Sequence, residues 1–208
     1  MTIHSAMDTL AHPEFDVFPG TGKRERILRA AVEVFARTGY FNARVSDVAK
    51  AAGVADGTIY LYFEGKEDLL ISIFREQSGV FLAGLRRELD QVAGSEAKIR
   101  TIVEYHFRTM GSDRALAVVL QVELRQSLKF ISLISREELG EYLQVICAVL
   151  EEGVRQGEFR PIANPQIVAN ALFGMLDEMM TTWILSEKAE PPLRYSGTIA
   201  HLILRGLT

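Results

Sequence analysis

The side chains that could carry out chemistry are few and scattered through this 208-residue sequence. Cys147 is the only cysteine and lies in the apolar stretch YLQVICAVL, so we interpret it as a core residue. His106 lies in EYHFRTM without a second histidine, a cysteine cluster or an HExxH pattern beside it. GxSxG, P-loop and GxGxxG patterns do not occur either. We therefore predict no metal site and no catalysis.

The charged side chains are distributed unevenly along the chain. The formal net charge is −4, which alone argues against nucleic acid as a partner. Residues 23–66, however, contain eight Lys or Arg and five Asp or Glu, a formal charge of +3, and the remaining residues carry −7. A small basic segment on an acidic body is typical of a protein that contacts phosphates at one end only.

Three short helices are predicted in this basic segment. From residue 24 apolar side chains recur at intervals of three and four, and this first helix ends near Gly39. VSDVAKAAG predicts a second helix of about two turns ending at Gly53, and a third begins at Ala55 or Asp56. Two short helices joined through a glycine are the helix-turn-helix pattern. A short buried helical hairpin is the alternative interpretation.

Long amphipathic segments follow, separated by glycine and proline. We expect helices at 66–91, 96–110, 113–128, 135–156, 165–187 and 193–206, and no strands, which predicts an all-α fold of about nine helices. The expected organisation is a flexible arm at 1–22, a DNA-binding domain at 23–65, and a larger helical domain at 66–208. No apolar run is long enough for a membrane span and the first residues do not resemble a signal peptide, so we expect a cytoplasmic protein.

The segment RERILRAAVEVFARTGYFNARVSDVAKAAGVADGTIYLYFEGKEDLL resembles the DNA-binding signature of the TetR family of transcriptional repressors. Ala43, Arg44 and Ala55 depart from it, because the family usually has Thr or Ser at these positions, so the hydroxyl contacts expected there must be absent or replaced. The matching positions include Ile27, Ala30, Ala31, Phe35, Gly39, Tyr40, Val48, Ala49, Ala52, Gly53, Val54, Gly57, Tyr60, Phe63 and Lys66.

The resemblance implies which residues of this segment bind DNA. Phosphate contacts position such a protein on the duplex, whereas contacts to base edges specify the sequence. For Tyr60 and Tyr62, packing within the domain is the alternative. The resemblance implies phosphate or sugar contacts for Thr58, Tyr60, Tyr62 and Lys66, close approach of the backbone at Gly57, and groove or backbone contacts for Arg44, Val45, Ser46, Ala55 and Asp56.

The second half carries a weaker resemblance. QVELRQSLKF and MLDEMMTTWIL, together with GVADGTIYLYF, are similar to the branch of TetR repressors that controls fatty-acid degradation and is released from DNA by long-chain acyl-coenzyme A. The resemblance implies no bound cofactor and a long-chain acyl-CoA as effector. A TetR-type regulator of a drug or another hydrophobic molecule remains an alternative.

The sequence contains the side chains that such an effector needs. An acyl chain requires an apolar lining, and the coenzyme A phosphates require cations, for which we expect Arg108 and Arg125. Core packing is the alternative for each apolar residue, an ion pair with Glu104 or Glu123 for each arginine, and a structural role for His106. The predicted lining consists of His106, Phe107, Met110, Leu120, Leu124, Leu128, Phe173, Leu176, Met180 and Trp183.

A dimer is expected because one recognition helix reads few bases and a two-fold protein matches a palindromic operator. The segment 165–187 is apolar on more than one face, which exceeds the need of one internal contact. A monomeric buried core is the alternative. The predicted interface consists of Ile167, Ala171, Met175, Met179, Ile199, Leu202 and Ile203.

The expected mechanism is a shift of the helix that begins at Lys66, which would change the distance between the two recognition helices when effector binds. Two other classes of protein remain open from the sequence. A helical carrier or enzyme would not need the basic segment, and a protein-protein adaptor would show no salt-dependent affinity for DNA.

Overall fold

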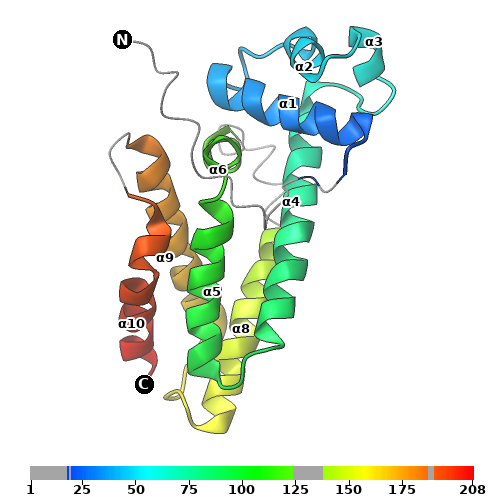
Figure 1. Ribbon diagram of the computed structural model, residues 1–208. Coiled ribbons are helices and arrows are strands. Elements are labelled where there is room, and N and C mark those ends of the chain that lie inside the picture. The colour runs from blue at the N-terminus through cyan, green and yellow to red at the C-terminus, as the bar shows by residue number, and fades with distance from the viewer. Residues whose placement is uncertain (1–17, 19, 124–137, 187–189) are drawn as a thin grey trace.

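The computed structural model describes residues 18, 20–123, 138–186 and 190–208 (Figure 1). Within these ranges every regular element is a helix, which confirms the predicted all-α class. The elements in chain order are α1 (Lys23–Thr38), α2 (Val45–Ala52), α3 (Asp56–Ile59), α4 (Lys66–Leu89), α5 (Ser95–Met110), α6 (Arg114–Gln121), α8 (Glu138–Gln156), α9 (Pro165–Leu185), the 3₁₀ helix η3 (Pro192–Tyr195) and α10 (Ser196–Leu207).

Helices α1, α2 and α3 form a small head at one end of the molecule (Figure 1). The apolar residues that predicted α1, Ile27 and Phe35 among them, are fully buried, and Val48 of α2 and Ile59 of α3 pack on the same cluster. Leu69 and Leu70, near the start of α4, belong to that cluster too. The packing of the head therefore continues past residue 65.

The position of Phe18 differs from the sequence prediction, which made residues 1–22 a flexible arm. Its side chain is buried in the head cluster, and the guanidinium of Arg29 donates to its carbonyl and, at 3.2 Å, to the carbonyl of Gly20. The end of this segment is therefore packed on α1. The prediction for residues 1–17 and 19 lies outside the described residues.

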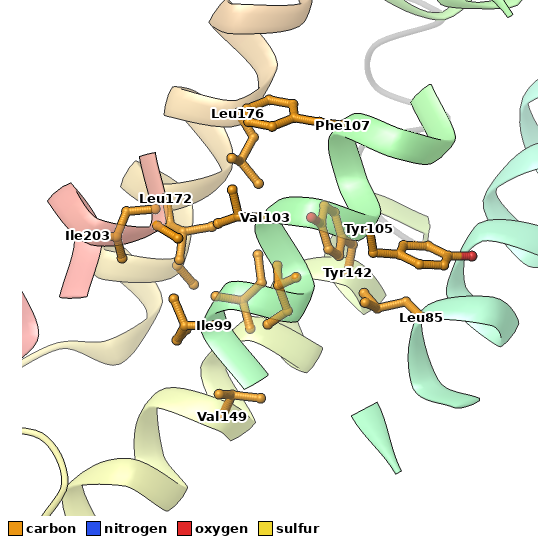
Figure 2. Packing of buried hydrophobic residues seen from close by; sticks show 14 of the residues in the cluster. Leu85, Ile99, Val103, Tyr105, Phe107, Tyr142, Val149, Leu172, Leu176 and Ile203 are labelled. Atoms are coloured by element: carbon orange, nitrogen blue, oxygen red, sulfur yellow. The ribbon is translucent and has the colours of Figure 1, made fainter. Parts of the chain in front are cut away.

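The body is a bundle in which α4, α5, α8 and α9 run along its length, with α10 packed against α5 (Figure 1). Its core is formed by the apolar faces of these helices, and Figure 2 shows Phe107 of α5 beside Leu176 of α9, and Ile203 of α10 pointing toward Leu172. α4 belongs to both parts, because its start packs in the head and its later residues pack in the body.

Among the described residues, helix ends agree with the sequence prediction to within two residues except at the end of α6 and the start of α10. The helix expected from residue 193 begins as the 3₁₀ helix η3, and α10 begins at Ser196. The helix expected over 113–128 is α-helical only from Arg114 to Gln121, and a turn follows at Val122. Asp113 caps its start, because the Asp113 carboxylate accepts the N–H of Leu116 at 3.0 Å. Residues 124–128 lie outside the described residues, as do residues 135–137 of the next expected helix. In the part of the chain that the structure describes, none of the helices combines the length and the apolar character that crossing a bilayer requires.

Candidate nucleic-acid interface and effector-binding core

The turn between α2 and α3 is a tight helix-turn-helix connection. Gly53 ends α2 with φ 65° and ψ 40°, a left-handed conformation that favours glycine, and the N–H of Val54 donates to the carbonyl of Ala49 at 3.0 Å. Val48, Ala49 and Ile59 are buried against α1. The opposite sides of α2 and α3 are therefore left at the surface at the end of the molecule (Figure 1).

Most of the residues predicted to contact DNA are exposed in the head. Tyr60 is 59% exposed and Tyr62 is 42% exposed, so neither is used mainly for packing within the head. Leu61, which the sequence prediction did not include, is 80% exposed between them. Among the other predicted DNA contacts, the exposed residues are Arg44, Ser46, Ala55, Asp56 and Gly57, and the half-buried ones are Val45, Thr58 and Lys66.

Gly57 has no internal packing reason to be glycine. A Cβ built on it would meet no heavy atom within 4 Å, and its φ is not positive. A glycine inside a helix is less favourable than alanine by about 1 kcal/mol. The space around Gly57 therefore leaves room for the predicted approach of DNA to its backbone.

Lys66 is held inside the head. Its ammonium donates to the carbonyls of Phe41 at 3.1 Å and Ala43 at 3.0 Å, and lies 4.6 Å from the centroid of the Tyr40 ring. These contacts join the start of α4 to the connection between α1 and α2. Sequence reasoning predicted a phosphate contact for Lys66 and missed this internal role, because nothing in the spacing indicates that residues 41–43 return to α4.

Two of the residues that depart from the family signature, Ala43 and Arg44, have identifiable roles in the head. Ala43 is buried in the head cluster, so its methyl group contributes to packing. The backbone N–H of Arg44 donates to the carboxylate of Asp47 at 3.1 Å, which caps the start of α2. The exposed side chain of Arg44 remains available at the predicted interface.

Most of the predicted effector-lining residues lie in the body core. His106, Phe107, Leu176, Met180 and Trp183 are buried, and Met110 and Phe173 pack against them from the edge of the same cluster. Leu120 is not with them, because it packs against the head cluster. The prediction for Leu124, Arg125 and Leu128 lies outside the described residues.

His106 is the polar centre of an aromatic group. Its Nδ1 lies 3.2 Å from the hydroxyl of Tyr142, the two rings stack at 13°, and Phe81 and Phe173 contact His106 edge-on. Its Nε2 is buried without a hydrogen-bond partner in the described residues. Burial lowers the pKa of His106 from 6.5 to about 4, against the opposing charge of Asp177, so the ring is neutral at pH 7. Burial also raises the pKa of the Tyr142 hydroxyl. The sequence prediction did not include Tyr142.

Arg108 is paired with carboxylates of its own chain. Its guanidinium forms ion pairs with Glu88 and, at 3.4 Å, with Glu104, and lies 5.5 Å from the centroid of the Tyr105 ring. The ion-pair alternative with Glu104 therefore describes Arg108 in this structure. Glu123, the other suggested partner, accepts the N–H of Tyr40. No group of three or more metal-ligating side chains occurs within the described ranges.

The predicted interface residues fall into two groups. Ile167 and Leu202 are each 61% exposed, Ala171 is exposed, and Met175, Met179 and Ile199 are partly buried at the edge of the body core. Ile203 is 7% exposed and lies inside the core of its own chain (Figure 2). Ile203 is thus placed for internal packing, whereas Ile167 and Leu202 are large apolar side chains on the surface of α9 and α10.

The fold and the head together define a helix-turn-helix regulator with a helical body. Residues 27–73 match the family described as bacterial regulatory proteins, tetR family, and residues 74–206 match the family described as YsiA-like protein, C-terminal region. The chain belongs to the TetR family of bacterial regulatory proteins.

One relative and two solved structures are similar to nearly the whole chain. It is 37% identical over 185 residues to the fatty acid metabolism regulator protein of Bacillus subtilis, covering 89% of this chain and 95% of that protein. The fatty acid degradation regulator FadR from Bacillus halodurans superposes with a TM-score of 0.85 at 39% identity, over 90% of this chain and 97% of that one. FadR from Bacillus subtilis in complex with stearoyl-CoA superposes with a TM-score of 0.83 at 38% identity, over 88% and 98%.

Proposed function

We propose that this protein is a transcriptional repressor that binds a palindromic operator as a dimer, controls fatty-acid degradation genes, and leaves the DNA on binding a long-chain acyl-CoA. The observation that carries the proposal is the similarity to FadR of Bacillus subtilis, which was solved with stearoyl-CoA and resembles both the head and the body of this chain. The protein would act in the cytoplasm, as a regulator and not as an enzyme.

The geometry of the head supports the DNA-binding half of the proposal. Exposed hydroxyl, basic and small residues gather on α2, α3 and the following turn, and the surrounding segment is the basic part of an acidic chain. Aromatic residues such as Tyr60 present a polar tip that can bond phosphate while the ring covers the sugar. Two such heads in a dimer would match two half-sites.

The composition of the body supports the acyl-CoA half. Its core between α5, α8 and α9 is apolar, and it includes Met180 and partly buried methionines that adapt to a flexible chain. The phosphates of coenzyme A need cations, and Arg108 would have to release Glu88 or Glu104 to serve them. We therefore propose the acyl chain in the body core, with Arg125 as the second cation for the head group.

The test is a gel-shift experiment on DNA fragments that the purified protein selects from the source genome. Palindromic fragments should be retained at low salt and released by stearoyl-CoA, but not by acetyl-CoA, free coenzyme A or stearate. Tyr60→Ala is the matched variant, because its exposed ring contributes little to folding, and it should lose operator binding while still binding stearoyl-CoA. Selection without release by any acyl-CoA would remove the effector assignment, and no selected DNA would remove the repressor itself.

A further inference from the structure

The residues just before α1 are built into the packing of the head. Phe18 is 1% exposed, and it belongs to the same cluster as apolar residues of α1, α4 and α6. Because α1 comes from the head and α4 continues into the body, this cluster lies where the two parts meet. The side chain of Phe18 is therefore a packing element of that junction.

Arg29 of α1 holds the backbone of the same segment. Its guanidinium donates to the carbonyl of Phe18 and, at 3.2 Å, to the carbonyl of Gly20. A planar guanidinium with five N–H donors can bond two neighbouring carbonyls at once, whereas a lysine ammonium lacks this fork geometry. The segment is thus fixed twice, by the buried ring of Phe18 and by Arg29. We call Phe18, residues 20–22 and Arg29 the N-terminal clasp.

The backbone of the clasp has a specific shape. Gly20 has φ 138°, a conformation that residues with a side chain rarely adopt, and a Cβ on it would lie 3.2 Å from Cγ of Glu25 in the first turn of α1. A glycine is therefore required where the chain turns between Phe18 and α1.

The start of α1 is also joined to α4. The guanidinium of Arg24 forms an ion pair with Glu76 of α4 and lies 5.3 Å from the centroid of the Phe63 ring. Val48 of α2 and Ile59 of α3 pack in the cluster that contains Phe18. The position of α1 on α4 therefore sets the position of the helix-turn-helix. Two heads read two half-sites only when each is held at the matching angle and separation.

We propose that the N-terminal clasp is part of the DNA-binding head, and that Phe18 and Arg29 are positioning residues for operator binding. They act through α1, which they hold against α4, and so keep α2 and α3 at a fixed angle to the body. The folded head then begins at Phe18, five residues before the first residue of α1. The proposal rests on the operator binding of the proposed function, and it does not depend on the effector.

The experiment measures the affinity of the full-length protein for the operator fragment selected in the gel-shift experiment, by fluorescence anisotropy. Phe18→Ala opens a cavity in the cluster, so F18A is expected to bind about tenfold more weakly. Phe18→Leu refills most of that space, and F18L is expected to stay within about threefold of wild type. Wild-type affinity in F18A, or an F18L variant as weak as F18A, would overturn the role of Phe18.

A matched control separates positioning from general loss of stability. Phe159 is 4% exposed in the body core and follows α8, whose end lies at the opposite end of the bundle from the head (Figure 1). Phe159→Ala removes the same side chain from a buried site, and F159A is expected to bind the operator within about twofold of wild type while it is folded. Equal weakening in F159A and F18A would overturn the proposal.

Arg29 is tested by two substitutions that leave the apolar cluster intact. Arg29→Lys keeps the charge and Arg29→Met removes it, but both lose the bonds to the two carbonyls. Both variants are expected to bind the operator about threefold to tenfold more weakly, with the salt dependence of wild type, because no phosphate contact is lost. Wild-type affinity in R29K, together with a shallower salt dependence in R29M, would instead make Arg29 a phosphate contact and overturn its positioning role.

Amide hydrogen exchange tests the clasp without DNA and remains decisive if F18A does not fold. In R29K the amides of α1 and α2 are expected to exchange about tenfold faster than in wild type, while those of α9 keep their rates. Unchanged exchange in the head, or an equal increase in all helices, would overturn the proposal. If the wild-type protein selects no DNA, the proposed function is wrong, and this exchange pattern still decides whether the clasp holds the head.

Discussion

At the scale of single residues, His106 combines a buried ring with one hydrogen bond to Tyr142. Its folded pKa of about 4 lies below the ordinary 6.5, so between these values the unfolded chain binds a proton that the folded chain excludes. Stability from this group is complete above pH 6.5 and is lost as the pH falls toward 4. The aromatic surroundings of His106 therefore make the body sensitive to acid.

This pH dependence can be measured by urea unfolding at fixed protein concentration between pH 7 and 4.5. Wild type should lose up to about 1.4 kcal/mol per pH unit through this group below pH 6.5. His106→Gln keeps a polar partner for Tyr142 but does not titrate, so its curve should be shallower by that amount. Parallel curves for the two proteins would contradict a neutral, buried His106.

A substitution at Gly57 tests whether DNA approaches the backbone there, because it does not disturb internal packing. Because a Cβ there meets nothing within the chain, Gly57→Ala should leave the free energy of unfolding unchanged or raise it by up to about 1 kcal/mol. Its operator affinity should fall by roughly tenfold if the duplex comes close to this backbone. Gly79→Ala on α4 is the control, since a Cβ there also meets nothing, and it should not change operator affinity. Equal affinities for both variants would remove Gly57 from the interface.

At the scale of elements, the helix-turn-helix depends on the conformation of one glycine. Gly53 has φ 65°, which an alanine adopts with strain and an asparagine more readily, and no neighbour limits the space for a side chain. Gly53→Ala should lower the free energy of unfolding by about 1 kcal/mol, and Gly53→Asn by less. Thermal unfolding of the two variants checks this order, and a destabilisation that is larger for asparagine would indicate crowding in place of strain.

The elements show which parts of the site the sequence could predict. Periodic apolar residues and glycine stops predicted α1 and α2, because those signals are local, and the exposed face of α2 and α3 followed from them. The contacts of Lys66 with residues 41–43 and of Glu123 with Tyr40 join positions far apart in the chain. Periodicity carries no information on such pairs, so both roles were missed. The end of α6 at Gln121 was also missed, since LAVVLQVEL continues its apolar pattern.

At the scale of the whole molecule, surface apolar residues on α9 and α10 indicate where a second copy would bind. Leu202 and Ile167 are each 61% exposed, and the pattern that predicted the interface also included Ile203, which is internal. When a helix has two apolar faces, its sequence does not indicate which face packs against the core. The structure separates the two faces, and the exposed one is the candidate for the dimer contact.

Leu202→Glu should disrupt this dimer, because it places an unpaired charge in an apolar contact at a penalty of at least about 2 kcal/mol. Sedimentation velocity at micromolar concentration should show a shift toward monomer, and operator affinity should fall in parallel. Gln144→Glu adds the same charge to the exposed surface of α8 and should change neither quantity. A dimer that survives L202E would place the interface elsewhere.

The central claim is that one molecule binds operator and long-chain acyl-CoA in competition through two conformations. The most direct measurement is calorimetric titration of stearoyl-CoA into the protein alone and into the protein saturated with operator. The account predicts weaker binding to the operator complex, by the same factor by which stearoyl-CoA weakens operator binding, on the order of 5 to 150. Equal affinity of stearoyl-CoA for the free and the operator-bound protein would contradict the account.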